Sequence, residues 1–272
     1  MTNIKVITKK GINTGKKIVI LAGVHGDEIC GVKAFDELIP KIGIDSGEVT
    51  FIYANLEAQK QVKRFIEYDL NRCFLENLPF EIKETLEGKT AEEIKPFLKK
   101  ADILLDLHSS KTSNSLKYIL CEKDCFNLIS VLSPENVILG IKDFQKGGSD
   151  GYMASQGKQG VCIECGLDKS QDSIELAKES IINILIKTKN IFGTNKETSP
   201  KKLFKTKKIY INKNKPFKLT KEFKDFEKFS RKTLIGYEGN KKVFFEKGDI
   251  ILFPKEHKEI TKECFLVLSN ED

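Results

Sequence analysis

The sequence is poor in histidine and arginine, with three residues of each among 272, which leaves 43 lysines among its 46 basic side chains. No apolar run approaches the roughly 20 residues that a membrane-spanning helix needs. The first ten residues lack the apolar core of a signal peptide. Seven cysteines, an odd number in a chain too long to need disulfides, fit a reducing compartment. We therefore expect a cytoplasmic protein with no membrane partner.

The formal net charge is +7, and lysine is densest over residues 199–218. That stretch has no arginine, few aromatic residues for base stacking and no nucleic-acid-binding motif. A solvated linker that runs into a strand explains it, so we expect no nucleic-acid partner. Its charge would still attract anionic metabolites weakly.

Apolar runs alternate with amphipathic segments over most of the chain, and this alternation predicts an α/β fold. Strands separated by helices predict a mixed, largely parallel sheet that is flanked by helices on both faces. We expect strands at 16–26, 48–55, 102–110, 115–122, 136–141 and 160–166, and helices at 27–42, 91–101 and 172–192.

The pattern changes near residue 194. A polar segment at 194–201 is followed by short alternating runs with turn residues between them, which are typical of β structure. We therefore expect a larger α/β domain over 1–193, a linker over 194–201 and a small β-rich domain over 202–272.

Acidic and imidazole side chains follow several of the predicted strands. His25 and Glu28 come directly after the first strand, His108 lies at the end of another, and Glu164 lies near the end of the last. Ligands of an open α/β sheet bind at the carboxyl ends of its strands. We expect these four side chains to meet at one edge of the sheet.

Imidazole nitrogen and carboxylate oxygen are zinc ligands, and a catalytic zinc site uses three protein ligands and one water. His25, Glu28 and His108 would supply them, and Glu164 would take a proton from the water. Each feature alone has an ordinary explanation, since an H-x-x-E pair is common in loops and a strand-end histidine is often only hydrogen bonded. Together, the four residues favour a zinc centre.

Four segments stand out, AGVHGDE (22–28), NLEAQKQVKRFIEYDLNRCF (55–74), DLHSS (106–110) and GVCIECG (160–166). In this order they resemble the succinylglutamate desuccinylase/aspartoacylase family of the zinc carboxypeptidase superfamily. The second is the most specific, because Asn55, Ala58, Arg64 and the run at 69–72 keep the family's spacing. The resemblance covers about 20–166 and, more weakly, the closing β-rich part. It implies a zinc-carboxypeptidase-like fold and a zinc-dependent amidohydrolase that cleaves the amide bond of an N-acyl amino acid.

The resemblance implies a role for each matching side chain. His25, Glu28 and His108 would bind one Zn²⁺ per chain. Glu164 would act as general base toward water and then as general acid toward the leaving amine. Arg64 would stabilise the oxyanion that forms at the scissile carbonyl.

Three further residues would surround this centre. The resemblance implies that Asn71 and Arg72 bind a carboxylate of a small-molecule substrate, Arg72 through two parallel hydrogen bonds. Asp69 would orient the imidazole of His25. Asp106 alternates onto the same strand face as His108, although an acidic residue near a strand end needs no special explanation.

One part of the family pattern is missing. Members that act on acidic N-acyl substrates carry an arginine shortly before the catalytic glutamate, where it binds the second carboxylate. Residues 147–160 contain no arginine here. Lys158 or Tyr152 could replace it, but a solvated lysine and a packed tyrosine explain these residues as well. Amide hydrolysis therefore follows from the resemblance more directly than action on an acidic substrate.

Cysteine pairs offer a second possible metal site. Cys162 and Cys165 form a C-x-x-C, and Cys121 and Cys125 could add two thiols. Side chains alternate along a strand, so Cys162 and Cys165 would point in opposite directions. We expect free thiols.

Two other functions remain open at this point. The chain could be a zinc carboxypeptidase that acts on a peptide end, which an open groove would favour. It could also be a zinc-binding module without activity, although the presence of the ligands, the base and the oxyanion arginine argues against this. The oligomeric state does not follow from the sequence.

Overall fold

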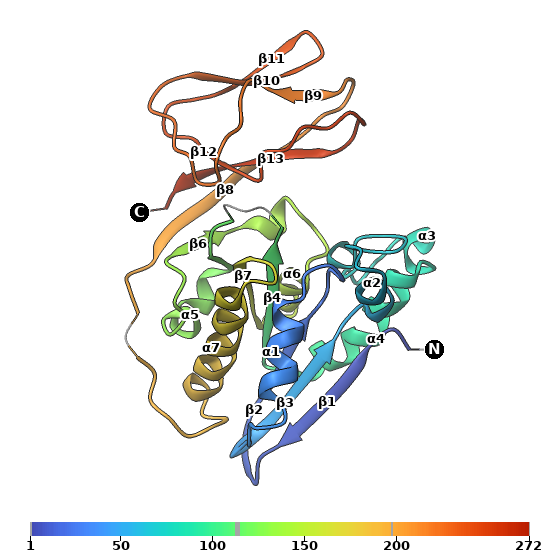
Figure 1. The fold of residues 1–272 in the computed structure, drawn as a ribbon, viewed down its shortest axis with the longest axis vertical. Coiled ribbons are helices and arrows are strands. Elements are labelled where there is room, and N and C mark those ends of the chain that lie inside the picture. The colour runs from blue at the N-terminus through green and yellow to red at the C-terminus, as the bar shows by residue number, and fades with distance from the viewer. Residues whose placement is uncertain (1, 112–114, 197, 272) are drawn as a thin grey trace. The chain divides into compact units, whose positions relative to one another are not determined.

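The computed structural model describes residues 2–111, 115–196 and 198–271 (Figure 1). They fall into two compact units, Met1–Val137 with Gln145–Lys201, and Ile138–Phe144 with Lys202–Asp272. The second unit thus takes residues 138–144 from the middle of the chain. Strand β6 (Asn136–Leu139) crosses the boundary between the units.

The first unit is built on a twisted sheet. Its strands are β1 (Lys5–Lys10), β2 (Asn13–Ala22), β3 (Ser46–Tyr53), β4 (Ile103–Ser110), β5 (Tyr118–Cys121) and β7 (Gln159–Leu167). They lie in the order β1-β3-β2-β4-β7-β5. The four inner strands are parallel, whereas β1 and β5 are antiparallel to their neighbours. The predicted mixed, largely parallel sheet is confirmed.

Helices cover both faces of this sheet. Helices α1 and α7 pack together on one face, and α4 and α6 pack on the other (Figure 1). Apart from η3 (Ile141–Asp143), which belongs to the second unit, the helices are α1 (Cys30–Leu38), α2 (Leu56–Gln61), η1 (Leu70–Arg72), α3 (Phe80–Lys83), α4 (Leu86–Lys100), η2 (Lys123–Cys125), α5 (Phe126–Ile129), α6 (Ser149–Ser155) and α7 (Gln171–Lys187).

The strand register brings the predicted site residues to one edge. Ala22 at the end of β2 pairs with Leu107 of β4, and His108 pairs with Glu164 of β7. Because the strands are parallel and paired in this register, they end at the same edge, and their apolar central residues are buried beneath helices on both sides. The loops after β2, β4 and β7 therefore converge there.

Helix α7 ends at Lys187, before the predicted end at 192, and two other helices begin several residues from their predicted starts for local reasons. Helix α1 begins at Cys30 rather than at residue 27, because residues 23–29 form a turn in which the Glu28 N–H donates to the His25 carbonyl at 3.1 Å. Helix α4 begins at Leu86, before the predicted start at 91, because the Thr85 side chain caps it by accepting from the Gly88 N–H.

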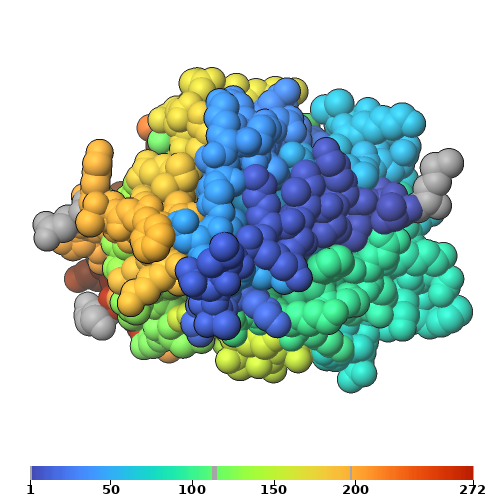
Figure 2. Space-filling view, turned by 90° about the horizontal axis from the view of Figure 1, so that it is seen from below, coloured from blue at the N-terminus to red at the C-terminus, as the bar shows by residue number. Residues whose placement is uncertain are grey.

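The segment after α7 lies against the start of the N-terminal strands. Figure 2 shows it in orange beside the blue residues of these strands. The Asn190 side-chain amide donates to the carbonyls of Lys16 and Ser46 at 2.9 and 2.8 Å. These bonds fix the end of the first unit opposite the edge that carries the site residues.

The second unit has its own aromatic core. In it β13 pairs with β8 and β12, and β10 pairs with β9 and β11, all antiparallel. The predicted β-rich character of the C-terminal part is confirmed, and the structure adds that its strands are antiparallel. Its core includes Phe217, Phe245 and Phe265, all nearly fully buried. The strands are β8 (Lys202–Ile211), β9 (Phe217–Leu219), β10 (Thr233–Glu238), β11 (Lys241–Phe245), β12 (Ile250–Leu252) and β13 (Glu263–Asn270).

Within the described residues, none of the helices combines the length and apolarity that a bilayer crossing requires.

Candidate metal centre and active site

Three side chains converge at the edge of the sheet where β2 and β4 end. The Glu28 carboxylate lies between two imidazoles, with Oε1 2.8 Å from His25 Nδ1 and Oε2 2.9 Å from His108 Nδ1. The two Nδ1 atoms are 3.2 Å apart. All three residues are buried, and together they form a cluster that could hold a metal ion.

The other nitrogen of each imidazole faces a carboxylate. His25 Nε2 is hydrogen bonded to Asp69 Oδ1 at 3.1 Å, and His108 Nε2 lies at an ion-pair distance of 3.2 Å from Asp106 Oδ2 without the geometry of a hydrogen bond. Carboxylate partners favour a proton on Nε2 and leave the Nδ1 lone pair free. Once a cation displaces any proton from Nδ1, the two Nδ1 atoms and the Glu28 oxygens are acceptors that face one another. A cation between them satisfies all of these groups, so the donor set fits a metal ion such as Zn²⁺.

The acidic members of this cluster are held ionised. Burial alone would raise the pKa of Glu28, but the charge of His25 and hydrogen bonds from both imidazoles lower it far below its ordinary value. Burial likewise opposes ionisation of Asp69, and His25 and Arg64 nevertheless lower the pKa of Asp69. Burial would lower the pKa of both imidazoles, but the neighbouring acidic groups raise it, so protons on the imidazoles balance much of this negative charge until a cation displaces them.

Arg64 reaches the cluster from the loop after α2. Its Nε donates to Asp69 Oδ2 at 3.1 Å, and its NH1 donates to Glu28 Oε1 at 3.3 Å. The Arg64 carbonyl accepts from the Gly26 N–H at 3.1 Å. A β-carbon on Gly26 would lie 2.2 Å from the Ala58 carbonyl carbon, so only glycine allows this turn to approach α2.

Glu164 lies on β7 beside His108 of β4. Burial, followed by the nearby charge of Glu28, raises the pKa of Glu164 to about 7. A carboxyl group with such a pKa can both take and give a proton near neutral pH.

Asn71 and Arg72 lie in η1, next to the start of α6. The Asn71 N–H donates to Asp69 Oδ1 at 2.9 Å, and Asn71 Oδ1 accepts from the Ser149 N–H at 3.1 Å. Arg72 NH1 donates to the Asn71 carbonyl at 3.0 Å. A β-carbon on Gly147 would lie 2.3 Å from the Arg72 carbonyl oxygen, so the glycine lets the two backbones pack.

The two suggested replacements for the missing arginine are engaged elsewhere. Lys158 donates to the carbonyls of Leu98 and Lys99 at the end of α4. The Tyr152 hydroxyl donates to Glu76 at 3.0 Å, and the ring belongs to the core beneath the sheet. Neither side chain is placed to bind a second substrate carboxylate.

Helix α6 instead places an acidic residue near the site. The Asp150 carboxylate and the Asn71 side chain both lie beside Gly148. A β-carbon placed on this glycine would be 2.7 Å from Asp150 Oδ1 and 3.6 Å from Asn71 Oδ1. Among the described residues, no basic side chain forms an ion pair with Asp150. Burial, reinforced by the charge of Asp106, raises the pKa of Asp150 to about 6.

This raised pKa predicts a pH-dependent gain for Asp150→Asn. The folded protein holds the Asp150 proton more tightly than the unfolded chain, so the stability due to this proton is complete below the ordinary pKa of 3.8 and is lost by pH 6. We therefore expect Asp150→Asn to gain stability relative to wild type as the pH rises. The difference in the free energy of unfolding, variant minus wild type, should be about 1–3 kcal/mol larger at pH 7 than at pH 4.

Urea unfolding at both pH values measures this difference. Asp172→Asn is the control, because Asp172 occupies the same position in the first turn of α7 and its side chain is 76% exposed. An equal pH response of both variants would contradict the assignment.

Two further residues that hold the site were not foreseen from the sequence. Glu87 of α4 is fully buried, and its carboxylate accepts from the N–H groups of Ile66, Glu67 and Tyr68, which shapes the loop between Arg64 and Asp69. The Ser149 hydroxyl donates to Asp106, the residue behind His108. Neither lies in a motif, and their partners are distant in sequence.

The seven cysteines are buried and unpaired. Among the described residues, His25, Glu28 and His108 form the one cluster with metal-ligand spacing. The structure thus provides no support for a cysteine site at 121–125 or 162–165.

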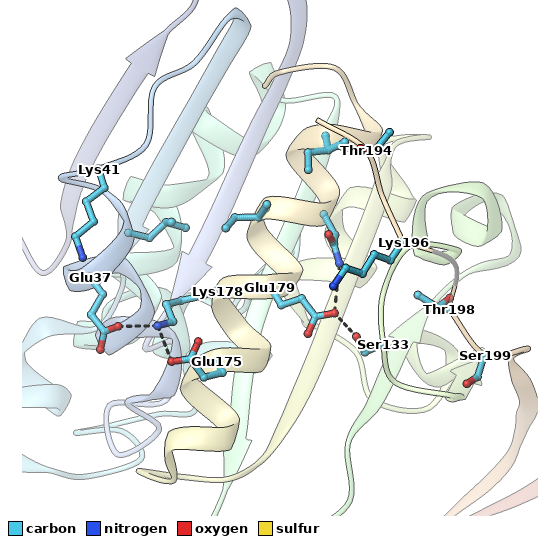
Figure 3. Close-up of a pocket in the computed structure, with 14 residues that line it drawn as sticks. Glu37, Lys41, Ser133, Glu175, Lys178, Glu179, Thr194, Lys196, Thr198 and Ser199 are labelled. Carbon is cyan, nitrogen blue, oxygen red and sulfur yellow. Dashed lines mark hydrogen bonds and ion pairs between the residues drawn. The ribbon is translucent and has the colours of Figure 1, made fainter. Parts of the chain in front are cut away.

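A groove of about 860 Å³ lies away from these residues, between α1, α7 and residues 194–199 (Figure 3). Lys178 crosses it and contacts Glu37 and Glu175 at 2.7 Å each. None of the predicted site residues lines it. We therefore assign this groove no part in the chemistry.

Residues 14–187 match the family model described as "Succinylglutamate desuccinylase/Aspartoacylase catalytic domain". A Nostoc protein named probable aspartoacylase is 32% identical over 166 residues, which cover 57% of this chain and 56% of that protein. A Danio rerio N-acyl-aromatic-L-amino acid amidohydrolase (carboxylate-forming) is 26% identical over 116 residues, 38% of this chain and 35% of that one. The chain thus spans about half or less of the length of these relatives.

The fold is shared more widely than the sequence. The X-ray structure of a succinylglutamate desuccinylase from Vibrio parahaemolyticus superposes with a TM-score of 0.80 at 18% identity, covering 99% of this chain and 92% of that one. This likeness includes the C-terminal part, which lies outside the region matched by the family model.

Proposed function

The chain belongs to the succinylglutamate desuccinylase/aspartoacylase family, and from this we propose that it is a zinc-dependent amidohydrolase that cleaves the amide bond of an N-acyl amino acid. The observation that supports this proposal best is the cluster of His25, Glu28 and His108 beside Glu164 and Arg64. Ligands, a proton-transfer group and an oxyanion donor meet at one edge of the sheet.

Zn²⁺ would be held by His25 Nδ1, His108 Nδ1 and the Glu28 carboxylate, the three groups that converge in the structure. When bound, it would lower the pKa of a water molecule to about 7 and act as a Lewis acid toward the scissile carbonyl. Asp69 and Asp106 would keep the two imidazoles in the orientation and tautomer that leave Nδ1 free.

Glu164 would carry the proton. As a carboxylate it accepts a proton from the attacking water, and as a carboxylic acid it returns that proton to the leaving amine nitrogen. Arg64 would donate to the carbonyl oxygen as negative charge develops there. Its contacts with Asp69 and Glu28 hold the guanidinium in place before substrate arrives.

Asn71 and Arg72 would bind the carboxylate of the amino acid. Asn71 is fixed through both its backbone N–H and its Oδ1, which leaves its side-chain NH₂ group to donate. The Arg72 guanidinium could bind the same carboxylate through two hydrogen bonds. These contacts suit a small substrate with a free carboxylate close to the scissile amide.

The side chain of the preferred amino acid would not be acidic. Asp150 near Asn71 has no basic partner among the described residues, and Lys158 points elsewhere. A second substrate carboxylate would meet like charge, which costs enough to lower kcat/KM by about 10–100-fold. We therefore expect N-acetylmethionine and N-acetyllysine to be better substrates than N-acetylaspartate or N-succinylglutamate.

A substrate panel tests this proposal. Release of the free amino acid from N-acyl amino acids and from short peptides would be measured with zinc-loaded and chelator-treated protein. Zinc-dependent release from neutral or cationic N-acyl amino acids supports it. Release only from peptide ends would favour a carboxypeptidase, and N-acetylaspartate as the best substrate would contradict the predicted side-chain preference.

A further inference from the structure

Asp168 lies one residue beyond β7 and joins three segments of the chain. Its N–H donates to the Ser110 carbonyl at 2.7 Å. Its Oδ1 accepts three hydrogen bonds, from the Ile29 N–H at 2.8 Å, the Cys30 N–H at 3.2 Å and the Ser109 hydroxyl at 2.9 Å. The residue is 8% exposed. It belongs to no segment that carries the family resemblance.

Each of these segments also carries a residue of the candidate centre. Glu28 directly precedes Ile29, and His108 directly precedes Ser109. The Ser109 N–H also donates to Glu28 Oε2 at 3.2 Å, and the Cys30 thiol donates to the His108 carbonyl at 3.6 Å. One carboxylate oxygen of Asp168 therefore connects the backbone that follows Glu28 to the side chain of the residue that follows His108.

Helix α1 depends on this contact for its start. Its N-cap residue Ile29 offers no side-chain hydrogen bond, and its first turn contains no acidic residue. Asp168, the residue after β7, supplies the acceptor that a helix usually finds in its own N-cap, and its charge lies at the positive end of the helix dipole. The end of Glu28's segment is thus fixed by a residue that directly follows the strand carrying Glu164.

Asp168 is also unusual because only one of its oxygens is satisfied. Its Oδ2 is buried and has no hydrogen-bond partner among the described residues. A buried and partly satisfied carboxylate lowers stability unless nearby positive charge offsets it. The N-terminus of α1 provides part of that charge, and a cation bound between His25, Glu28 and His108 would add to it.

We propose that Asp168 is a positioning residue that fixes Glu28 and His108 relative to each other and thereby sets the affinity of the centre for its metal ion. The inference rests on the proposed function, since it takes these residues as metal ligands. Asp168 differs from Asp69 and Asp106 because it acts through the backbone and not on an imidazole. Loss of contacts that orient metal ligands typically lowers metal affinity by about 10–100-fold.

The test is the zinc affinity of the full-length protein, measured by competition with a chromophoric chelator. We expect Asp168→Ala to weaken zinc binding by about 10–100-fold, and Ser109→Ala, which removes one of the three bonds, by about tenfold. Asp168→Asn keeps an oxygen acceptor at this position, so it should retain much of the zinc affinity that Asp168→Ala loses. Ser109→Ala keeps the test valid if Asp168→Ala does not fold.

Glu238→Gln is the matched control. Glu238 of β10 accepts from the N–H groups of Lys213 and Asn214 and from the Tyr210 hydroxyl, the same bond types in the second unit. It should lower thermal stability and leave zinc affinity unchanged. Wild-type affinity in Asp168→Ala or Ser109→Ala, or an equal loss in Glu238→Gln, would overturn the inference. A wild-type protein that binds no zinc would instead overturn the proposed function.

Discussion

Glu164→Gln is expected to lower kcat for a good N-acyl amino acid substrate by about 10²–10⁴-fold and to leave bound zinc unchanged. Glutamine has nearly the same shape as glutamate but cannot accept a proton from water or return one to the amine. Glu164 lies beside His108 and outside the ligand cluster, so its replacement should not release the ion. The measurement is steady-state hydrolysis together with zinc content of the same preparation.

A glutamate elsewhere on the first unit serves as the control for this change. Glu175 lies on α7, its side chain is 55% exposed, and its carboxylate accepts hydrogen bonds from Lys178 and Gln171, both on the same helix. Glu175→Gln should retain wild-type kcat. Hydrolysis by Glu164→Gln at the wild-type rate would contradict its role in proton transfer, whereas loss of both zinc and activity would indicate a role in metal binding.

His108→Ala is expected to abolish both zinc retention and hydrolysis. The substitution removes one of three converging donors and leaves the Asp106 carboxylate without its imidazole partner. Two remaining ligands are too few for a stable catalytic zinc site. Zinc content after purification and hydrolysis of N-acetylmethionine are the two measurements.

His257→Ala is the matched control, because His257 is the one histidine of the sequence outside the cluster. It lies in the second unit, and its Nε2 is 3.0 Å from the Glu263 carbonyl oxygen. This variant should keep its zinc. Full zinc content in His108→Ala would show that the ion is bound elsewhere and would contradict the role of His108 as a ligand.

Several features of the fold and site were predictable because their signals are local. The apolar runs that become β2, β4 and β7 are strands in the structure, and polar residues directly follow or end them. Parallel strands bring such residues to one edge, so the meeting of His25, Glu28 and His108 followed from pattern and topology together.

Other features were not predictable because they depend on contacts between distant segments. Asp168 contacts residues 29, 30 and 109, and Glu87 contacts residues 66–68, with no local pattern that marks either carboxylate. The start of α1 was misplaced for the same reason, since the acceptor that caps it is Asp168, which follows β7. The directions of Lys158 and Tyr152 likewise required the packing of α4 against α6.

The central claim is that a zinc ion is bound by His25, Glu28 and His108, and anomalous X-ray scattering from crystals of the zinc-loaded protein tests it most directly. Data collected on either side of the zinc absorption edge would locate the ion. The account predicts a peak about 2.0–2.2 Å from His25 Nδ1, His108 Nδ1 and a Glu28 oxygen. No peak among these three side chains, or a peak at the cysteines instead, would contradict it.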